Sequence, residues 1–155
     1  MTNIRRSLMG LLATGATLLL LTLGAAPAHA AGYSYDGTLP NTAAGGYCAT
    51  GSSQITPDYP IKVGGTGATV GYVNVRYSPS CGTNWVTMYT SLTGYTQAKG
   101  IDRASPIYFH YEQDPGAGST FSPQVYAPGS TCISISGELW NSSGTYATSG
   151  WIYVC

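Results

Sequence analysis

The sequence predicts an all-β protein, a small antiparallel sandwich or barrel of about six or seven short strands, stapled by two disulfides. Three observations favour this class. Several segments alternate apolar and polar residues with the period of a half-buried strand, and clusters of turn-forming residues separate them. The chain also has 155 residues with 21 glycines, thirteen tyrosines and only 8% charged residues. Its four cysteines supply the staples.

The strand pattern is clearest at residues 70–77, where Val73 and Val75 alternate with Asn74 and Arg76. A segment dense in turn formers follows, and the extended pattern then resumes, which predicts a hairpin. No helix is predicted after residue 30. The other ranges that we interpret as strands are 85–90, 107–112, 132–140 and 151–155, with weaker extended runs at 54–62, 68–69 and 121–126.

Residues 1–30 have the parts of a secretory signal peptide. Two arginines precede a long apolar run, and a small-x-small pattern ends at Ala30, which predicts cleavage between Ala30 and Ala31. A membrane anchor is the alternative, because the run is close to the roughly 20 residues that a spanning helix needs. Glycines and Pro27 interrupt the run and favour the signal peptide. We therefore expect a secreted, extracellular protein that leaves the membrane after cleavage.

Cleavage leaves a flexible N-terminal arm at 31–46, rich in glycine and small residues, and a single disulfide-bonded β-domain at 47–155. These two segments carry four basic and six acidic residues. So few cations argue against nucleic acid as a partner and against attraction to anionic lipid. The partners that we predict are other secreted proteins, with a glycan as the other kind of ligand considered.

The even number of cysteines in an exported chain predicts disulfides. A zinc site is disfavoured because the cysteines lie far apart in the sequence and one histidine accompanies them after cleavage. Four cysteines allow three pairings, and the residues alone do not choose among them. We favour the sequential pairing, Cys48 with Cys81 and Cys132 with Cys155, because it suits neighbouring strands of a meander.

Enzymatic chemistry has little support in the sequence. A Ser-His-Asp triad would depend on His110, and no catalytic motif accompanies it. His110, Glu112 and Asp114 share one face of a strand and could act as acid and base, but the simpler interpretation is a solvent face opposite Phe109 and Tyr111. We predict no enzyme, cofactor or metal. The carboxylates that could form a glycosidase pair are Asp102, Glu112, Asp114 and Glu138, and their order singles out no pair.

The many aromatic residues admit two interpretations. Tyrosine and tryptophan on an exposed sheet can stack on sugar rings or anchor a protein interface. The alternative is that most of them fill the core, and we expect Trp85, Trp140 and Trp151 to be buried.

The N-terminal arm has its own candidate binding residues. Tyr33, Tyr35 and Leu39 are spaced along an extended chain, with Asp36 between them. Such a segment can add a strand to a partner or lie in its groove. These four residues are the partner-binding positions that the sequence suggests, although a mobile tail without function fits the same composition.

A specific resemblance covers residues 35–90. The phrase Gly71-Tyr72-Val73-Asn74-Val75-Arg76-Tyr77-Ser78-Pro79-Ser80-Cys81-Gly82-Thr83-Asn84-Trp85, preceded by Tyr35-Asp36-Gly37 and Cys48, resembles the YjfA-like family of small secreted actinobacterial proteins. The resemblance implies a bridge between Cys48 and Cys81. It supplies no catalytic residues, and it says little about the chain after residue 90.

Small secreted β-proteins with an N-terminal arm are also similar to the adaptor subunits of streptomycete umbrella toxin particles, which link a lectin-bearing subunit to a toxin-carrying stalk. This similarity implies that residues 31–46 dock on one subunit and that the β-domain binds another. We therefore predict a secreted, non-enzymatic protein-binding module, as an adaptor in a toxin complex. The alternatives are a carbohydrate- or cell-wall-binding module, and a small hydrolase or protease inhibitor.

Overall fold

The structure is a computed structural model that describes residues 32–104 and 107–155. The predicted signal peptide and the cleavage site between Ala30 and Ala31 lie outside the described residues. Within the described ranges, no helix is long and apolar enough to cross a membrane.

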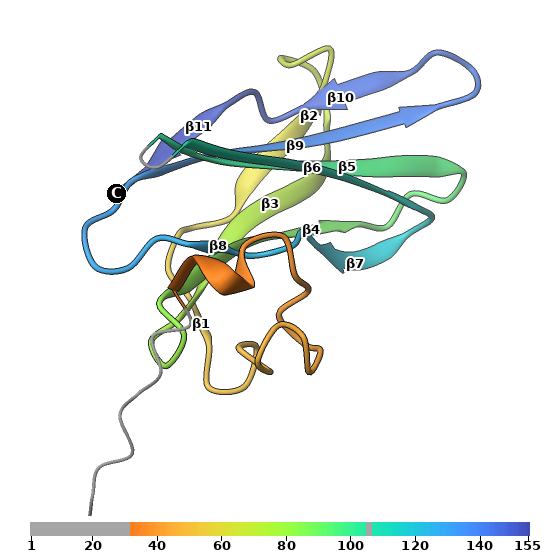
Figure 1. The fold of residues 1–155 in the computed structure, drawn as a ribbon. Helices are drawn as coiled ribbons and strands as arrows, with labels where there is room; N and C mark the ends of the chain where they lie inside the picture. Colours follow the sequence, from red (N-terminus) through yellow and green to blue (C-terminus); the bar gives the residue numbers. More distant parts are fainter. Residues whose placement is uncertain (1–31, 105–106) are drawn as a thin grey trace, which may run out of the picture.

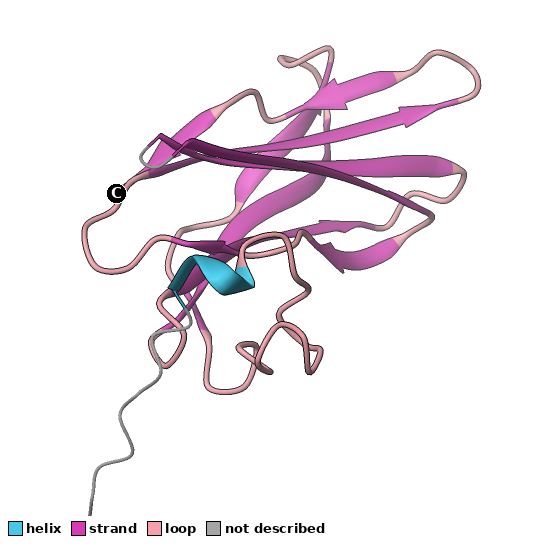
Figure 2. Cartoon of the chain, in the orientation of Figure 1, coloured by secondary structure: helices cyan, strands magenta, loops and turns pink. Residues whose placement is uncertain are grey.

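The strands form one antiparallel sheet that curls into a nearly closed barrel (Figure 1). Figure 2 shows that strands and loops make up almost all of the described chain. The sheet order is β6-β5-β9-β10-β2-β3-β4-β7, with β1 on β3, β8 on β4 and β11 on β9. The elements are η1 (Gly32–Tyr35), a 3-10 helix, and the strands β1 (Ser53–Gln54), β2 (Tyr59–Val63), β3 (Thr69–Ser78), β4 (Thr83–Thr90), β5 (Tyr95–Ala104), β6 (Ile107–Pro115), β7 (Gly118–Phe121), β8 (Val125–Tyr126), β9 (Ile133–Asn141), β10 (Tyr146–Thr148) and β11 (Ile152–Val154).

The predicted all-β class is confirmed, and the strands are more numerous than the six or seven expected. The reason is that weak extended runs divide into short pieces. The run at 54–62 covers parts of β1 and β2, and the run at 121–126 joins the end of β7 to β8. The stronger predicted strands correspond to β3, β4, β6, β9 and β11.

The hairpin of β3 and β4 builds one wall of the core. Val73 lies opposite Met88 and Val75 opposite Val86, and all four side chains are fully buried. Gly82 in the turn has a φ of 66°, which favours glycine, and a Cβ there would meet the Tyr126 ring. Other buried apolar residues of this core are Ile61, Ile101, Val125, Ile133, Ile135 and Leu139.

A strand that the sequence analysis misses, β5, lies between β6 and β9 and pairs with both along almost its whole length. Its inward positions are mostly polar, because Gln97, Lys99 and Arg103 are buried there beside Ile101. Alternation of apolar and polar residues is therefore absent from this strand. The three-residue strand β10 also lies outside the predicted strand ranges.

Side chains of β5 bridge the seam between β6 and β7, the end strands of the sheet. Lys99 forms an ion pair with Asp114 of β6 and donates to Thr120 Oγ1 of β7 at 3.1 Å. Gln97 Nε2 donates to the Gly116 carbonyl oxygen at 2.8 Å, in the turn that joins these two strands. Polar side chains thus close the barrel where backbone pairing stops.

The prediction of a flexible arm at 31–46 is wrong for the described residues of that segment. Residues 32–46 run beneath the lower end of the barrel, drawn in orange in Figure 1, and contact it closely. Asp36 binds the buried Arg103 through both carboxylate oxygens, at 3.1 and 2.7 Å, and accepts from the Tyr126 amide at 2.5 Å. The amide of Gly37 and the carbonyl of Thr38 pair with the backbone of Gln124. The segment therefore belongs to the β-domain.

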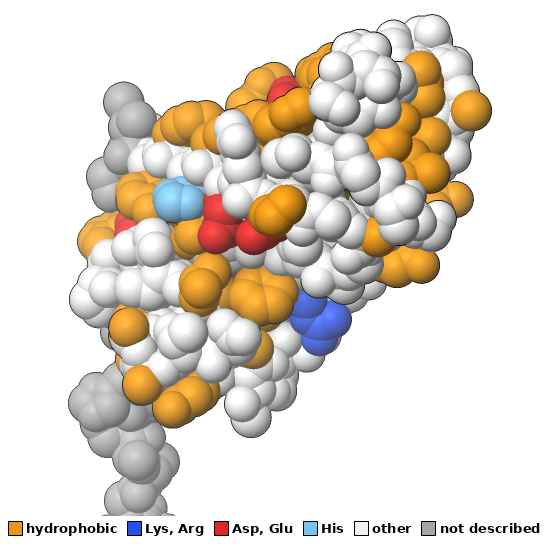
Figure 3. All heavy atoms as spheres, turned by 90° about the vertical axis from the view of Figure 1, so that its right-hand side faces the viewer, with side chains coloured by type: hydrophobic (Ala, Val, Ile, Leu, Met, Phe, Trp, Pro, Cys, Tyr) orange, Lys and Arg blue, Asp and Glu red, His pale blue; other side chains and the backbone are white. Residues whose placement is uncertain are grey.

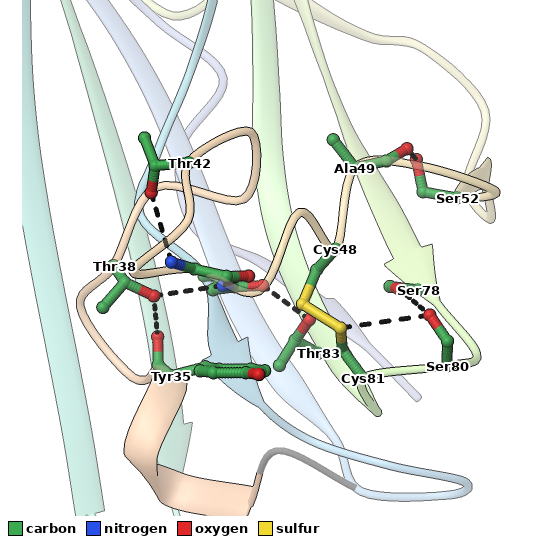
Figure 4. The surroundings of a disulfide bond; sticks show 12 residues. Tyr35, Thr38, Thr42, Cys48, Ala49, Ser52, Ser78, Ser80, Cys81 and Thr83 are labelled. Atoms are coloured by element: carbon green, nitrogen blue, oxygen red, sulfur yellow. Dashed lines mark hydrogen bonds between the residues drawn. A yellow bond between two sulfur atoms is a disulfide. The ribbon is translucent and has the colours of Figure 1, made fainter. Parts of the chain in front are cut away.

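Both predicted disulfides are confirmed. Cys48–Cys81 ties the loop after the N-terminal segment to the β3–β4 turn, and Figure 4 shows the bridge beside Thr83 and Ser80. The buried side chain of Gln124 organises this region, since it accepts from Thr83 Oγ1 at 2.7 Å and donates to Thr38 Oγ1 at 3.1 Å. Cys132–Cys155 ties the C-terminus to the segment before β9.

Candidate functional site

The two faces of β6 are opposite to the expectation. Phe109 and Tyr111 point outward, with exposed fractions of 55% and 38%. The pairing register explains this, because Phe109 lies opposite Asp102 and Tyr111 opposite Gly100, both on the outer side of β5. The alternating side chains, which include His110, lie along the barrel seam and are partly buried.

The inward side of β6 carries a compact ionic group. Asp114 binds Lys99, whose side chain is fully buried, and Glu112 is the cross-strand partner of Lys99. Burial raises the pKa of Glu112, with Lys99 acting in the opposite direction and Asp114 adding to the rise. Burial also lowers the pKa of His110. Figure 3 shows acidic side chains gathered beside the histidine on this side of the molecule.

A cleft of about 210 Å³ lies next to this group, lined by Glu112, Asp114, Leu39 and Phe121 among others. Glu112 Oε2 is buried and has no hydrogen-bond partner among the described residues. The other two carboxylates considered for glycoside hydrolysis, Asp102 and Glu138, occupy the outer face and are not brought to this cleft. The arrangement is an ion pair between Lys99 and Asp114 beside one carboxylate oxygen of Glu112 that has no hydrogen-bond partner among the described residues. In the part of the chain that the structure describes, no three metal-ligating side chains come together.

Replacing Glu112 with glutamine is expected to stabilise the protein at neutral pH. Because the folded-state pKa of Glu112 is above its ordinary value of 4.5, the folded protein holds this proton more tightly than the unfolded chain does. The free energy of unfolding therefore falls as pH rises from about 4.5 through the folded-state pKa of Glu112. The Glu112→Gln variant removes this loss. Melting curves from pH 3.5 to 8 should show a higher Tm for the variant at pH 7 and no such gain at pH 3.5. An unchanged or lower Tm at pH 7 would contradict this account.

The outer side of the same strands carries a group of exposed rings, which we call the aromatic face. It lies on β6, β10 and β11 and comprises Phe109, Tyr111, Tyr146, Trp151 and Tyr153. Trp151 is 57% exposed and Tyr153 is 70% exposed. Exposed aromatic rings gathered on one face of a domain typically mark an interaction site.

The three tryptophans differ from the expectation that all would be buried. Trp85 is 2% exposed and packs against the Cys48–Cys81 bridge, so it confirms the prediction. Trp140 is half-buried, and the prediction is wrong for Trp151.

A glycine on β5 allows the rings of the aromatic face to meet. The centroids of Phe109 and Trp151 are 6.0 Å apart with the ring planes at 50°. Between their strands lies Gly100, where an added Cβ would be 3.0 Å from the Trp151 ring and 2.6 Å from Ser136 Oγ. The absence of a side chain at Gly100 thus seats the indole close to the sheet.

Two carboxylates lie next to rings of the aromatic face. The Tyr111 hydroxyl donates to Glu138 Oε2 at 3.1 Å. Burial raises the pKa of Tyr111 to about 12, and the charge of Glu138 adds to the rise, so the hydroxyl stays protonated at neutral pH. Asp102 lies beside Phe109. The described outward side chains of β5, β6, β9 and β11 include these two carboxylates and no lysine or arginine.

The four predicted partner-binding residues of the N-terminal segment contact their own barrel. Tyr33 packs edge-on against Tyr126 at 5.1 Å and lies under the Arg103 guanidinium at 4.7 Å. Asp36 is bound to Arg103, as described above. Tyr35 packs on the Cys48–Cys81 cluster, and Leu39 lines the cleft beside Glu112. Of the four, Tyr33 is the one that stays largely exposed, at 55%.

The sequence predicts the alternation of Phe109 and Tyr111 along β6 correctly, but the prediction that these two side chains face the core is wrong. Phe109 and Tyr111 were placed in the core, and Tyr153 was not singled out. The signal that could have found the face is the repeat of an aromatic residue at every second position near both 109–111 and 151–153. No family model, curated protein or solved structure matches this chain.

Proposed function

We propose that the protein is a secreted, non-enzymatic binding module that docks on another extracellular protein through the aromatic face. The observation that carries the proposal is the contact between exposed Phe109 and Trp151 above Gly100. Exposed rings expel water over a large area at little cost in side-chain entropy, which is why aromatic residues are enriched at the centre of protein interfaces.

The composition of the aromatic face favours a protein over a glycan. Phe109, the ring that contacts Trp151, is the one member of the aromatic face without a hydroxyl or indole N–H, so this central contact is apolar. The carboxylates of Asp102 and Glu138 lie beside them, and the outward side chains described on those two strands include no lysine or arginine. We therefore expect a partner with an apolar patch bordered by lysine or arginine.

The ionic group inside the seam supports the non-enzymatic part of the proposal. Asp114 is committed to the buried Lys99, and Glu112 lies at a cross-strand position beside it. Asp114 therefore has a structural explanation in its ion pair with Lys99. An adaptor role in an extracellular toxin complex is a finer form of the same proposal, in which the aromatic face replaces the N-terminal segment as the docking surface.

The double variant Phe109→Ser with Trp151→Ser is expected to weaken partner binding by at least about 100-fold, because each truncation at a hot spot costs about 2 kcal/mol or more. The tagged chain would be used to recover a stoichiometric partner from the culture medium of the producing organism, and the affinity for the purified partner would then be measured. The matched control is Tyr72→Ser with Tyr89→Ser, an exposed cross-strand aromatic pair on β3 and β4.

The control pair should bind the partner like the parent chain. Equal binding by both double variants would refute docking through the aromatic face. Retention of the parent chain on chitin, cellulose or peptidoglycan, lost only in the Phe109 and Trp151 variant, would instead identify the face as a glycan site and overturn the choice of a protein partner.

A further inference from the structure

A second cavity, of about 330 Å³, lies on the outer side of β3, β4 and β7, beneath the loop between η1 and β1. Its lining includes the aromatic side chains of Trp85 and Phe121, together with Arg76, Thr87 and Ser52. The register places these side chains on one face, since Arg76 lies opposite Trp85 and Thr87 opposite Phe121. We call it the Arg76 cavity. Its volume is at the lower end of the range of small-molecule sites, about 300–1,000 Å³.

The guanidinium of Arg76 is held in place by hydrogen bonds from two of its three nitrogens. Its Nε donates to Ser52 Oγ at 3.2 Å, and its Nη2 donates to the Ser52 carbonyl oxygen at 2.9 Å. The two buried cations of the barrel, Lys99 and Arg103, each pair with a carboxylate, whereas Arg76 has no carboxylate within ion-pair distance in residues 32–104 and 107–155. A half-buried guanidinium that lines a cavity and lacks a counter-charge is suited to bind an anion.

An unpaired hydroxyl lies in the same lining. Thr87 Oγ1 is buried and has no hydrogen-bond partner among the described residues, and the same holds for Oδ1 of Asn74, its cross-strand neighbour. Buried polar atoms are rarely left without a partner, because each lost hydrogen bond costs about 1–3 kcal/mol. Thr87 Oγ1 is closed off from the cavity in this structure, and rotation of the Thr87 side chain about χ1 would bring the hydroxyl to a ligand that supplies its partner.

We propose that the Arg76 cavity binds a carboxylate attached to one apolar side chain. The carboxylate accepts from Arg76 Nη1 and from the Thr87 hydroxyl, and the side chain packs against Trp85 and Phe121. A free N-acylated aromatic amino acid and the C-terminal residue of a peptide share this chemistry. The site is separate from the aromatic face and does not depend on the function proposed for it.

The first test is calorimetric titration of the secreted chain with N-acetyl-L-phenylalanine and with its uncharged amide. We expect the acid to bind and the amide to bind at least about tenfold more weakly, because charged hydrogen bonds contribute about 1.5–3 kcal/mol. Equal affinity for acid and amide, or no binding of the acid at millimolar concentration, would overturn the proposal. The Phe109 and Trp151 double variant should bind the acid as the parent chain does.

Two variants locate the ligand. Arg76→Gln is expected to weaken binding of the acid at least about tenfold. Lys62→Gln, which removes a cation outside the cavity, should leave it unchanged. Because Arg76 also binds Ser52, a melting curve checks that Arg76→Gln is folded. Thr87→Val serves as a second variant that keeps the side-chain shape. It should weaken binding severalfold without lowering Tm. Full affinity in folded Arg76→Gln or in Thr87→Val would place the carboxylate elsewhere.

The source of the carboxylate is resolved by two peptides. A hexapeptide that ends in phenylalanine with a free carboxylate is compared with the same peptide amidated at the C-terminus. Tighter binding of the free-acid peptide than of N-acetyl-L-phenylalanine assigns the site to protein C-termini. Binding of the amino acid but of neither peptide assigns it to a small molecule.

Discussion

Replacing Asp36 with alanine is expected to lower the free energy of unfolding by about 3–5 kcal/mol, because the change leaves the guanidinium of Arg103 buried without a counter-charge. Arg103 is only 2% exposed, and the Asp36 carboxylate supplies two of its hydrogen bonds. The same carboxylate accepts from the Tyr126 amide. Since a domain of this size is stable by about 5–15 kcal/mol, the variant should lose a large part of its stability.

Urea unfolding at pH 7 measures this effect. Asp58→Ala is the matched control, because Asp58 is an exposed carboxylate that accepts from Gln54 and Asn74, and its loss should cost less than about 1 kcal/mol. The double variant Asp36→Ala with Arg103→Met should recover much of the loss, since it removes the buried charge as well. A cost below 1 kcal/mol for Asp36→Ala would mean that the N-terminal segment is not anchored as described.

Removal of either disulfide is expected to cost about 3–4 kcal/mol in the chain-entropy model, because the bridges close loops with sequence separations of 33 and 23. The two double variants should differ in function. Cys132→Ala with Cys155→Ala releases the end of β11, which carries Tyr153 and follows Trp151 directly. Cys48→Ala with Cys81→Ala leaves that strand untouched.

Both variants would be compared by urea unfolding and by affinity for the partner recovered with the parent chain. The Cys132 and Cys155 variant should lose affinity under conditions where it is still folded, while the Cys48 and Cys81 variant should lose stability alone. Equal affinities for the two folded variants would show that β11 needs no covalent anchor to present its rings.

The parts of the fold that follow from local pattern were predictable from the sequence. In β3, Val73 and Val75 alternate with polar residues, so both the strand and its buried face are predicted correctly. The turn after it contains Pro79 and Gly82, and these turn-forming residues predict the hairpin. Sequential disulfide pairing was also favoured correctly, because neighbouring segments of an antiparallel fold bring consecutive cysteines together.

The parts that depend on distant partners were not predictable. The inward face of β6 carries His110, Glu112 and Asp114, which hydropathy assigns to solvent, and only the buried Lys99 on another strand explains why they turn inward. The N-terminal segment has the composition of a loose tail. Its anchor, Arg103, lies 67 residues from Asp36 in the sequence, and no local signal connects the two.

The predicted position of Phe109, now part of the aromatic face, is wrong for a related reason. Phe109 was assigned to the core because it is apolar, and its true position is set by Asp102 and Gly100 on the neighbouring strand. The need for glycine at position 100 depends on the ring of Trp151, which is far away in the sequence and packs against Gly100.

The buried ions of β5 have a consequence for how the barrel is assembled. A strand that slips by one residue against its neighbours turns every side chain to the opposite face. In β5, apolar burial gives little protection against such a slip, because Ile101 is the one large apolar residue that is fully buried at its inward positions, and Ala98 and Gly100 would fit inside as well. Lys99 and Arg103 would then lose Asp114 and Asp36 together. We therefore expect the two ion pairs to specify the register of β5 against its neighbours, because burial of apolar side chains distinguishes poorly between the two registers.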